Sequence, residues 1–120
     1  MTSDLYTSAG FTAVEPVATL RSIAHLYASN KKGSRCGIYL LILQDGTHYI
    51  GQAIDVVRRF AQHRLRYDIV GFSFIRTREA KLDELERDKI FLAESLGLRL
   101  VNFIHTTVVT GETDLDLLLP

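Results

Sequence analysis

The chain has 120 residues, 47% of them hydrophobic, which predicts one domain with a core of its own and leaves no room for a second folded module. Its longest apolar run, residues 38 to 43, is too short to cross a bilayer, and no basic-then-apolar leader opens the chain. We therefore expect a soluble, cytoplasmic protein without a membrane partner. The single cysteine, Cys36, has neither a disulfide partner nor metal-ligand companions, so we expect it to be structural.

The formal net charge is zero, but the charges are unevenly distributed. Residues 21 to 81 hold eleven Lys or Arg against four Asp or Glu, whereas residues 82 to 120 hold three against eight. Basic side chains neutralise phosphate, so the central stretch is the part that suits a nucleic-acid partner. A backbone-tracking surface is expected from Lys31, Lys32, Arg35, Arg64, Arg66, Arg76 and Arg78. Ordinary solubility is the competing explanation for such residues.

The N-terminal part predicts an arm followed by a helix. Residues 1 to 13 are small, polar and unpatterned, which is typical of a loose arm. Pro16 suits the first position of a helix. Apolar residues then follow at helical spacing: Leu20, Ile23, Ala24 and Tyr27. A loop over residues 30 to 35 leads out of this predicted helix.

The next segment predicts a hairpin around Asp45-Gly46. A two-residue turn would place Tyr39 and Tyr49 on opposite faces, because side chains alternate along a strand. A three-residue loop over residues 44 to 46 instead pairs Leu41 with Tyr49 and brings both tyrosines to one face. We predict the longer loop, with Gly46 in the left-handed conformation that closes it.

A helix over residues 55 to 66 is predicted after the hairpin. Arg59 and His63 lie four residues apart, so they are stacked on one side of this helix and border its apolar face. Arg58 points elsewhere. Taken alone, Arg59 would be a solvated residue at the fringe of the core, and His63 would be an ordinary surface histidine.

Residues 69 to 77 are rich in β-branched and aromatic side chains and predict the third strand. A second helix follows over residues 79 to 96, with Gly97 as its C-cap. Glu86 projects into the apolar arc of this helix, where an acid has to be paired, protonated or metal-bound. Lys89, which also falls on the inward side, is its alternative partner.

This order predicts an α/β domain with a small, mainly antiparallel three-stranded sheet flanked by helices and an added N-terminal helix. We place the arm and first helix in residues 1–36, the main domain in 37–104, and a C-terminal extension in 105–120, with a short edge strand over residues 98 to 109. The apolar ending and the solvent-side Phe91 suggest a fragment of a longer protein, a further domain or a partner subunit.

Two tripeptides, Gly37-Ile38-Tyr39 and Tyr49-Ile50-Gly51, carry a resemblance to a known family. Four polar residues follow them at matching places: Arg59, His63, Glu86 and Asn102. Together these motifs resemble the GIY-YIG endonucleases, over roughly residues 37 to 102.

The resemblance implies metal-dependent hydrolysis of phosphodiester bonds in DNA, with RNA left open as a partner. Glu86 would hold Mg²⁺ or Mn²⁺, which needs only one or two carboxylates. Arg59 would clamp the scissile phosphate, and Tyr39 would be the general base or orient water. Tyr49 would contact phosphate through its hydroxyl, and His63 would orient water or phosphate.

Four further residues are expected at the substrate: Gly51, Gln52, Arg58 and Asn102. We expect Gly51 to let the chain leave its strand and approach nucleic acid closely, and Arg58 to touch the backbone nonspecifically. Gln52 stands where some members of the family carry a lysine. Asn102 matches the family's asparagine and is expected to tie backbone together near the site.

Two other classes of function compete with the nuclease. A nucleic-acid-binding module of the same fold with weak or no cleavage is suggested by Gln52, Lys89 and the zero net charge. A protein-interaction domain without a nucleic-acid role is suggested by the acidic, apolar C-terminal segment.

Overall fold

A computed structural model describes residues 2–27 and 33–101 of the chain. Its helices and strands are, in order, α1 Thr2–Ser8, β1 Glu15–Pro16, β2 Gly37–Leu43, β3 His48–Ala53, α2 Val56–His63, β4 Ile69–Arg76, a 3₁₀ turn at Glu79–Lys81, and α3 Leu82–Ser95. Within the described ranges, no helix is long and apolar enough to cross a membrane.

The sheet has four antiparallel strands in the order β1-β4-β2-β3, so the prediction of three strands is wrong. The fourth strand is β1, in which Glu15 pairs with Phe72 and Pro16 with Gly71. Two residues are too few to show strand periodicity in a sequence. Because proline has no N–H, Pro16 also suits an edge strand.

The predicted N-terminal helix starting at Pro16 is also wrong. Residues 17 to 27 form successive turns, in which the amides of Leu20, Leu26 and Tyr27 each bond a carbonyl three residues earlier. Such turns repeat with nearly the same spacing as a helix, which explains the misleading pattern. The helix of this region is α1, where a loose arm was expected.

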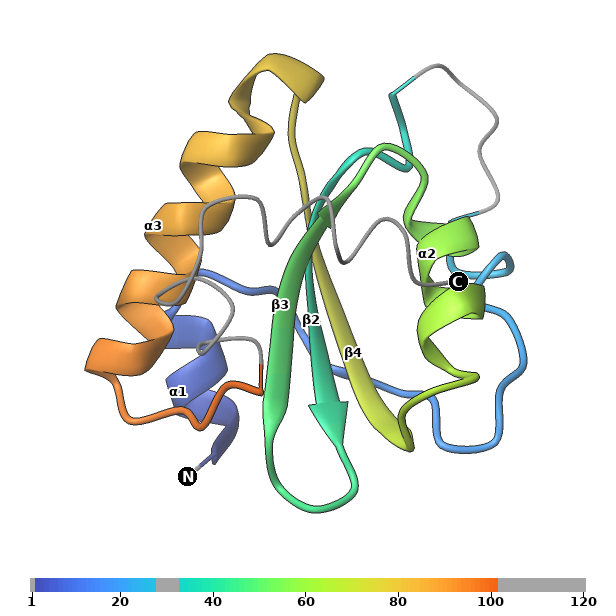
Figure 1. Ribbon diagram of the computed structural model, residues 1–120, viewed down its shortest axis with the longest axis horizontal. Helices are drawn as coiled ribbons and strands as arrows, with labels where there is room; N and C mark the ends of the chain where they lie inside the picture. Colours follow the sequence, from blue (N-terminus) through green and yellow to red (C-terminus); the bar gives the residue numbers. More distant parts are fainter. Residues whose placement is uncertain (1, 28–32, 102–120) are drawn as a thin grey trace.

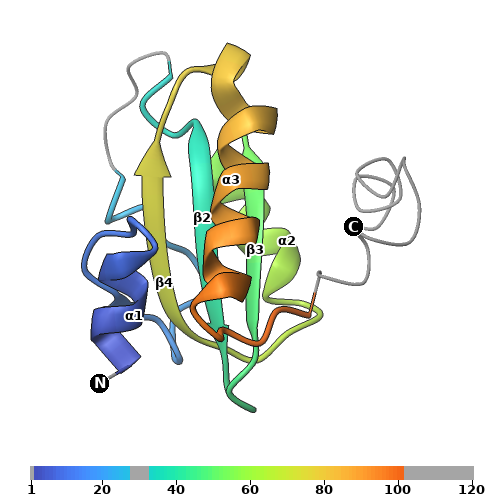
Figure 2. The ribbon, with the colours of Figure 1, turned by 90° about the vertical axis from the view of Figure 1, so that its left-hand side faces the viewer.

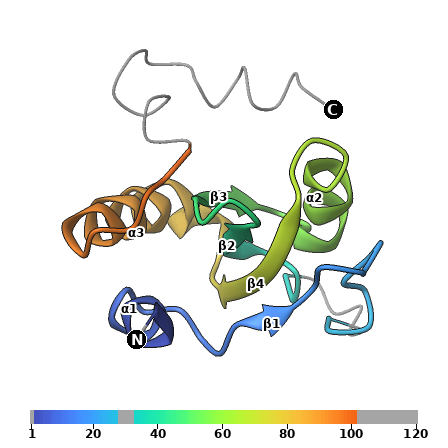
Figure 3. The ribbon, with the colours of Figure 1, turned by 90° about the horizontal axis from the view of Figure 1, so that it is seen from below.

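The sheet separates two apolar layers, as Figures 1 and 3 show. Helices α1 and α3 cover one face, and α2 with residues 17 to 27 covers the other. Seen from the side of α3, that helix lies in front of β2 and β3 and runs nearly along them, with α1 beside β4 (Figure 2). Because side chains alternate along a strand, Ile38 and Leu40 face α3, whereas Tyr39 and Leu41 face α2.

A bulge in β4 adjusts this alternation. Ile42 pairs with Gly71 but Leu43 pairs with Ile69, so Val70 is the extra residue. The bulge brings Ile69 and Phe72, three residues apart, into the same layer on the α2 side. A strand was predicted here, but the alternation within it depends on pairing with β2.

The two main helices agree with the sequence within a turn at each end. Asp55 caps α2 by accepting hydrogen bonds from the amides of Val57 and Arg58. The prediction that Gly97 ends the second helix is confirmed, since its φ is 90° and the amide of Leu98 reaches back to the carbonyl of Ala93.

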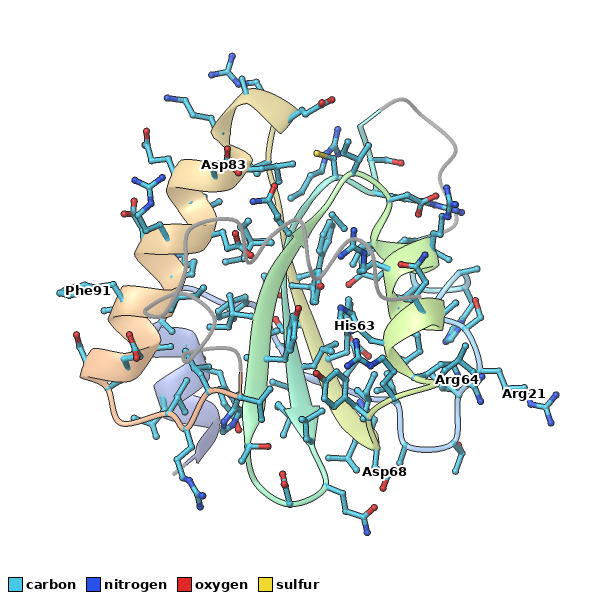
Figure 4. The ribbon with its side chains drawn as sticks, viewed as in Figure 1. Arg21, His63, Arg64, Asp68, Asp83 and Phe91 are labelled. Atoms are coloured by element: carbon cyan, nitrogen blue, oxygen red, sulfur yellow. The ribbon has the colours of Figure 1, made fainter. Side chains whose placement is uncertain are left out.

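The chain after α3 returns to the edge strand. Leu100 forms an isolated parallel bridge with His48, and the rest of the predicted edge strand lies outside the described residues. Phe91 is 72% exposed and points away from the sheet, as predicted (Figure 4).

Candidate active site

The hairpin brings the two motif tyrosines together as predicted. Leu41 pairs with Tyr49, and Gly46 has a φ of 88°, so the three-residue loop is confirmed. Tyr39 and Tyr49 therefore lie on the same face, with parallel rings whose centroids are 6.1 Å apart. Both side chains are buried in the layer that α2 covers.

Gly51 was expected to end its strand but does not. It lies inside β3 and is buried, so the chain does not leave the strand at this position. Tyr39 is its direct partner on β2. A Cβ on Gly51 would lie 2.6 Å from Cζ of Tyr39 and 3.0 Å from Cε1 of Tyr49. Because Gly51 has no side chain, the Tyr39 ring has room to lie over the edge strand β3 at this position.

Helix α2 supplies the third member of the cluster. Val56, Phe60 and His63 are its buried residues, at the spacing of one helix face. His63 points from this face toward the sheet (Figure 4) and its Nε2 lies 2.7 Å from the hydroxyl of Tyr39. Its ring centroid is 4.6 Å from that of Tyr49. His63 is thus a buried partner of the first motif tyrosine, whereas the helix pattern taken alone would have made it a surface histidine.

Tyr67 joins the cluster and was missed by the sequence interpretation. The ring centroid of Tyr67 lies 5.8 Å from the ring centroids of both Tyr49 and His63. The guanidinium carbon of Arg66 also lies 5.8 Å from the centroid of the Tyr67 ring. The signal was present in the spacing, because Tyr67 follows His63 by four residues. It lies beyond the end of α2, where the helical period no longer predicts direction.

The arginines of α2 have different surroundings. Arg59 is half-buried one turn before His63, while Arg58 is exposed, in agreement with the predicted directions. Arg64 is half-buried and Arg66 is exposed. Arg35 contacts the protein's own backbone, because its Nε donates a hydrogen bond to the carbonyl of Tyr27.

Tyr27 lies on the same side of the sheet but belongs to the core. Its ring meets those of Phe72 and Phe74 edge-on, at 6.0 and 5.2 Å. Burial first, and then the negative charge of Glu15, raise the pKa of Tyr27 to about 12. Tyr27 therefore holds its proton more strongly than a free tyrosine does.

Glu86 lies across β3 from the tyrosines. It is half-buried on α3, where its Oε1 accepts a hydrogen bond of 2.9 Å from Nε2 of Gln52. The same nitrogen donates to Oδ1 of Asp83 at 2.7 Å. Asp83 and His63 extend from opposite flanks of the sheet in Figure 4. The predicted inward position of Glu86 is thus one that faces the edge strand.

Lys89, the alternative partner predicted for Glu86, extends toward Gly10 instead. Nζ of Lys89 lies against Gly10, at the place where a Cβ on that glycine would be. Lys89 therefore covers the chain just after α1, and Glu86 turns to Gln52.

The donor set at Glu86 fits a hard divalent cation. Mg²⁺ keeps most of its waters and takes one or two carboxylates from a protein, and Glu86 provides one beside Asp83. The described residues contain no group of three or more His, Cys, Asp or Glu side chains that would form a closed metal site. A cation held at these carboxylates would take its remaining ligands from outside these side chains.

Some predicted residues lie outside the described part of the chain, namely Asn102, Lys31 and Lys32. Cys36 is buried, and burial followed by the nearby charge of Glu79 raises the pKa of its thiol, as suits the structural role expected of it.

Strand β3 therefore separates two groups of predicted site residues. Tyr39, Tyr49 and His63 meet on its α2 side, and Gln52 and Glu86 meet on its α3 side. Comparisons with protein-family models, with curated proteins and with solved structures found no match.

Proposed function

We propose that the chain is a divalent-metal-dependent endonuclease of the GIY-YIG type that hydrolyses phosphodiester bonds in DNA. The observation that carries this proposal is the 2.7 Å hydrogen bond between the Tyr39 hydroxyl and Nε2 of His63, in a pair that lies beside Tyr49 and one helical turn from Arg59. A free phenol, with a pKa of about 10, is a poor base at neutral pH. A histidine nitrogen that accepts its proton supplies what such a base lacks.

The pair supports a short proton path. With its own proton on Nδ1, His63 accepts at Nε2 from Tyr39, which in turn takes a proton from the attacking water. The water oxygen bonds to phosphorus as the bond from phosphorus to the leaving oxygen breaks. Tyr49, whose ring packs against both members of the pair, holds them in place and offers its hydroxyl to the phosphate.

Arg59 is the proposed phosphate clamp. It lies one helical turn from His63, so a phosphate at the Tyr39 hydroxyl is within reach of a long guanidinium side chain on the same flank. The fork of an arginine donates to two phosphate oxygens at once. The exposed Arg58 and Arg66 extend the positive charge along this side of the edge strand.

Glu86 is the proposed metal ligand. When bound there, Mg²⁺ or Mn²⁺ would neutralise charge on the phosphate in the transition state. The protein's contribution is to hold this carboxylate across β3 from the proton acceptor, so that the two act on one phosphate from opposite sides.

The test is cleavage of supercoiled plasmid and of single-stranded DNA with Mg²⁺ or Mn²⁺. We expect Glu86→Gln to lower the rate at least a hundredfold, equivalent to about 3 kcal/mol of transition-state stabilisation. Glu84→Gln removes the same charge from an exposed position on the same helix and should leave the rate unchanged. Chelation of the metal should stop cleavage. Equal rates for the two variants would rule out the proposed metal site.

A second candidate is a nucleic-acid-binding module with little or no cleavage. The observation that favours it is burial, because Tyr39 is only 1% exposed and His63 only 5%. A substrate has to reach the Tyr39 hydroxyl for the chemistry above. DNA binding that weakens with salt, without cleavage under any metal condition, would favour this candidate.

A further inference from the structure

We propose that Gln52 is a positioning residue that directs the Glu86 carboxylate toward the divalent cation, with Asp83 as the anchor that fixes Gln52. The inference rests on the proposed function, because it takes Glu86 as the metal ligand. It assigns a role to two side chains that motif matching leaves without one. Gln52 was expected only as a substrate contact, and Asp83 had no predicted role.

The hydrogen bonds define the orientation of the Gln52 amide. Its Nε2 lies 2.7 Å from Oδ1 of Asp83 and 2.9 Å from Oε1 of Glu86, so each amide hydrogen has an acceptor. The reverse orientation would direct the amide oxygen at two carboxylates and make no hydrogen bond to either of them. Asp83 and Glu86 are three residues apart on α3, which places both on the side that meets β3.

The contact with Gln52 and cation binding can coexist on one carboxylate. An ionised carboxylate has about four acceptor sites, so a hydrogen bond from Gln52 does not by itself prevent Glu86 from ligating a cation. A hydrogen bond to the outer side of a ligating carboxylate orients it, and loss of such a partner typically lowers metal affinity about tenfold or more. A neutral amide does this without placing a positive charge beside the metal.

Strand β3 connects the Gln52–Glu86 contact with the Tyr39–His63 pair on its other side. Gly51 and Gln52 are consecutive, so their positions face opposite sides of the strand. Gly51 accommodates Tyr39 on one side, and Gln52 holds Glu86 on the other. The same short piece of paired backbone therefore sets the separation between the proton acceptor and the metal ligand.

The first test measures metal binding rather than cleavage. Mn²⁺ binding to the full chain is titrated by electron paramagnetic resonance for the wild type and for Gln52→Leu, which keeps the approximate size but removes the donors. We expect the dissociation constant to rise about tenfold. The melting temperature without metal should change little, because Gln52 is only half-buried. A purely structural role would give the opposite pattern.

Gln52→Met is the second variant, and it keeps the proposal testable if Gln52→Leu does not fold. Methionine is unbranched and about as long as glutamine, but it has no side-chain donor for Asp83 or Glu86. We expect a melting temperature near that of the wild type and a rise of about tenfold in the dissociation constant for Mn²⁺. Wild-type Mn²⁺ affinity in this variant would overturn the proposal.

Asp83 is tested as an anchor by two substitutions. Asp83→Asn keeps a side-chain oxygen for Gln52 and should retain most of the Mn²⁺ affinity. Asp83→Ala releases Gln52 and should weaken binding severalfold. Asp88→Asn, exposed on the same helix, is the control for loss of charge. Equal, large losses in both Asp83 variants, with the control unchanged, would overturn the anchor role.

The results distinguish failure of this inference from failure of the proposed function. Unchanged Mn²⁺ affinity in Gln52→Leu, with binding and cleavage lost in Glu86→Gln, would overturn the role of Gln52 and leave the nuclease intact. Unchanged Mn²⁺ affinity in Glu86→Gln would overturn both, because Glu86 would then not be the ligand.

Discussion

The two faces of the sheet each contain a buried tyrosine hydrogen-bonded to a histidine, yet only one pair lies in a candidate site. Tyr39 and His63 meet at 2.7 Å on the α2 face, and Tyr6 and His48 meet at 2.8 Å on the α3 face. All four side chains are buried. Neither the residue types nor the hydrogen bond nor the degree of burial distinguishes the pairs.

The surroundings make the difference. His48 is held at Nδ1 by the carbonyl of Arg99 at 3.1 Å, and its backbone bonds Arg99 and Val101. The Tyr6–His48 pair thus fastens α1 and the chain after α3 to the start of β3. The Tyr39–His63 pair instead lies beside Tyr49, one turn from Arg59. A tyrosine–histidine pair is therefore informative about function only together with its neighbours.

Removal of one hydroxyl from each pair should give the largest contrast. Tyr39→Phe should lower DNA cleavage about a hundredfold or more, the usual effect of losing a general base, while Tyr6→Phe should leave it within a few fold. Each loses the hydrogen bond to its histidine, and this loss should make both variants unfold about 1 kcal/mol more easily in urea. Equal loss of cleavage in the two variants would remove the functional distinction between the faces.

The next largest effect is expected at Gly51. Gly51→Ala places a methyl group on the Tyr39 ring, which Tyr49 and His63 hold in position, and we expect a loss of roughly 1–3 kcal/mol in the free energy of unfolding. Cleavage per folded molecule should also fall. Gly97→Ala is the control, since it strains a φ of 90° where a Cβ would meet nothing within 4 Å, and it should reduce stability alone.

A smaller effect concerns how the helices on the two faces begin. Asp55→Ala removes the side-chain cap of α2 and should cost about 1 kcal/mol in thermal or urea unfolding. Lys81→Ala, at the matching position of α3, removes no capping bond and should change stability little. If the two variants were equally stable, the cap would not be what orders the start of α2.

The smallest effect is expected in the pH dependence of stability. Burial lowers the pKa of His48 below its ordinary value of 6.5, so as the pH falls the unfolded chain binds a proton before the folded chain does. The contribution of this neutral histidine is complete above the unfolded pKa and declines as the pH falls from there through the folded pKa. His48→Gln should flatten this slope in urea titrations from pH 7 to 5. A slope identical to that of the wild type would show that His48 does not titrate on unfolding.

Much of the fold followed from local pattern. The hairpin register depended on the alternation of side chains along each strand and on Gly46, which can take a positive φ. Both features can be recognised in the sequence of residues 37 to 53. Helices α2 and α3 had capping residues and one apolar face. The two wrong predictions near the N-terminus, a loose arm and a helix starting at Pro16, have the same cause. Both α1 and β1 are too short to show a pattern in the sequence. Tyr6 and Phe11 pack α1 against the core, and β1 pairs with the edge of β4, so contacts rather than local propensity order this region.

At the site, the sequence by itself determined which chemical groups are present and which of them lie on the same element. It placed Tyr39 and Tyr49 on one face and put Arg59 one turn from His63, because strand and helix periods act over a few residues. Only the tertiary structure decided that His63 binds Tyr39, that Gly51 yields its space to that ring, and that Gln52 joins Asp83 and Glu86. Those contacts join residues 12 to 34 positions apart, and their geometry depends on how the helices pack on the sheet, which no local period encodes.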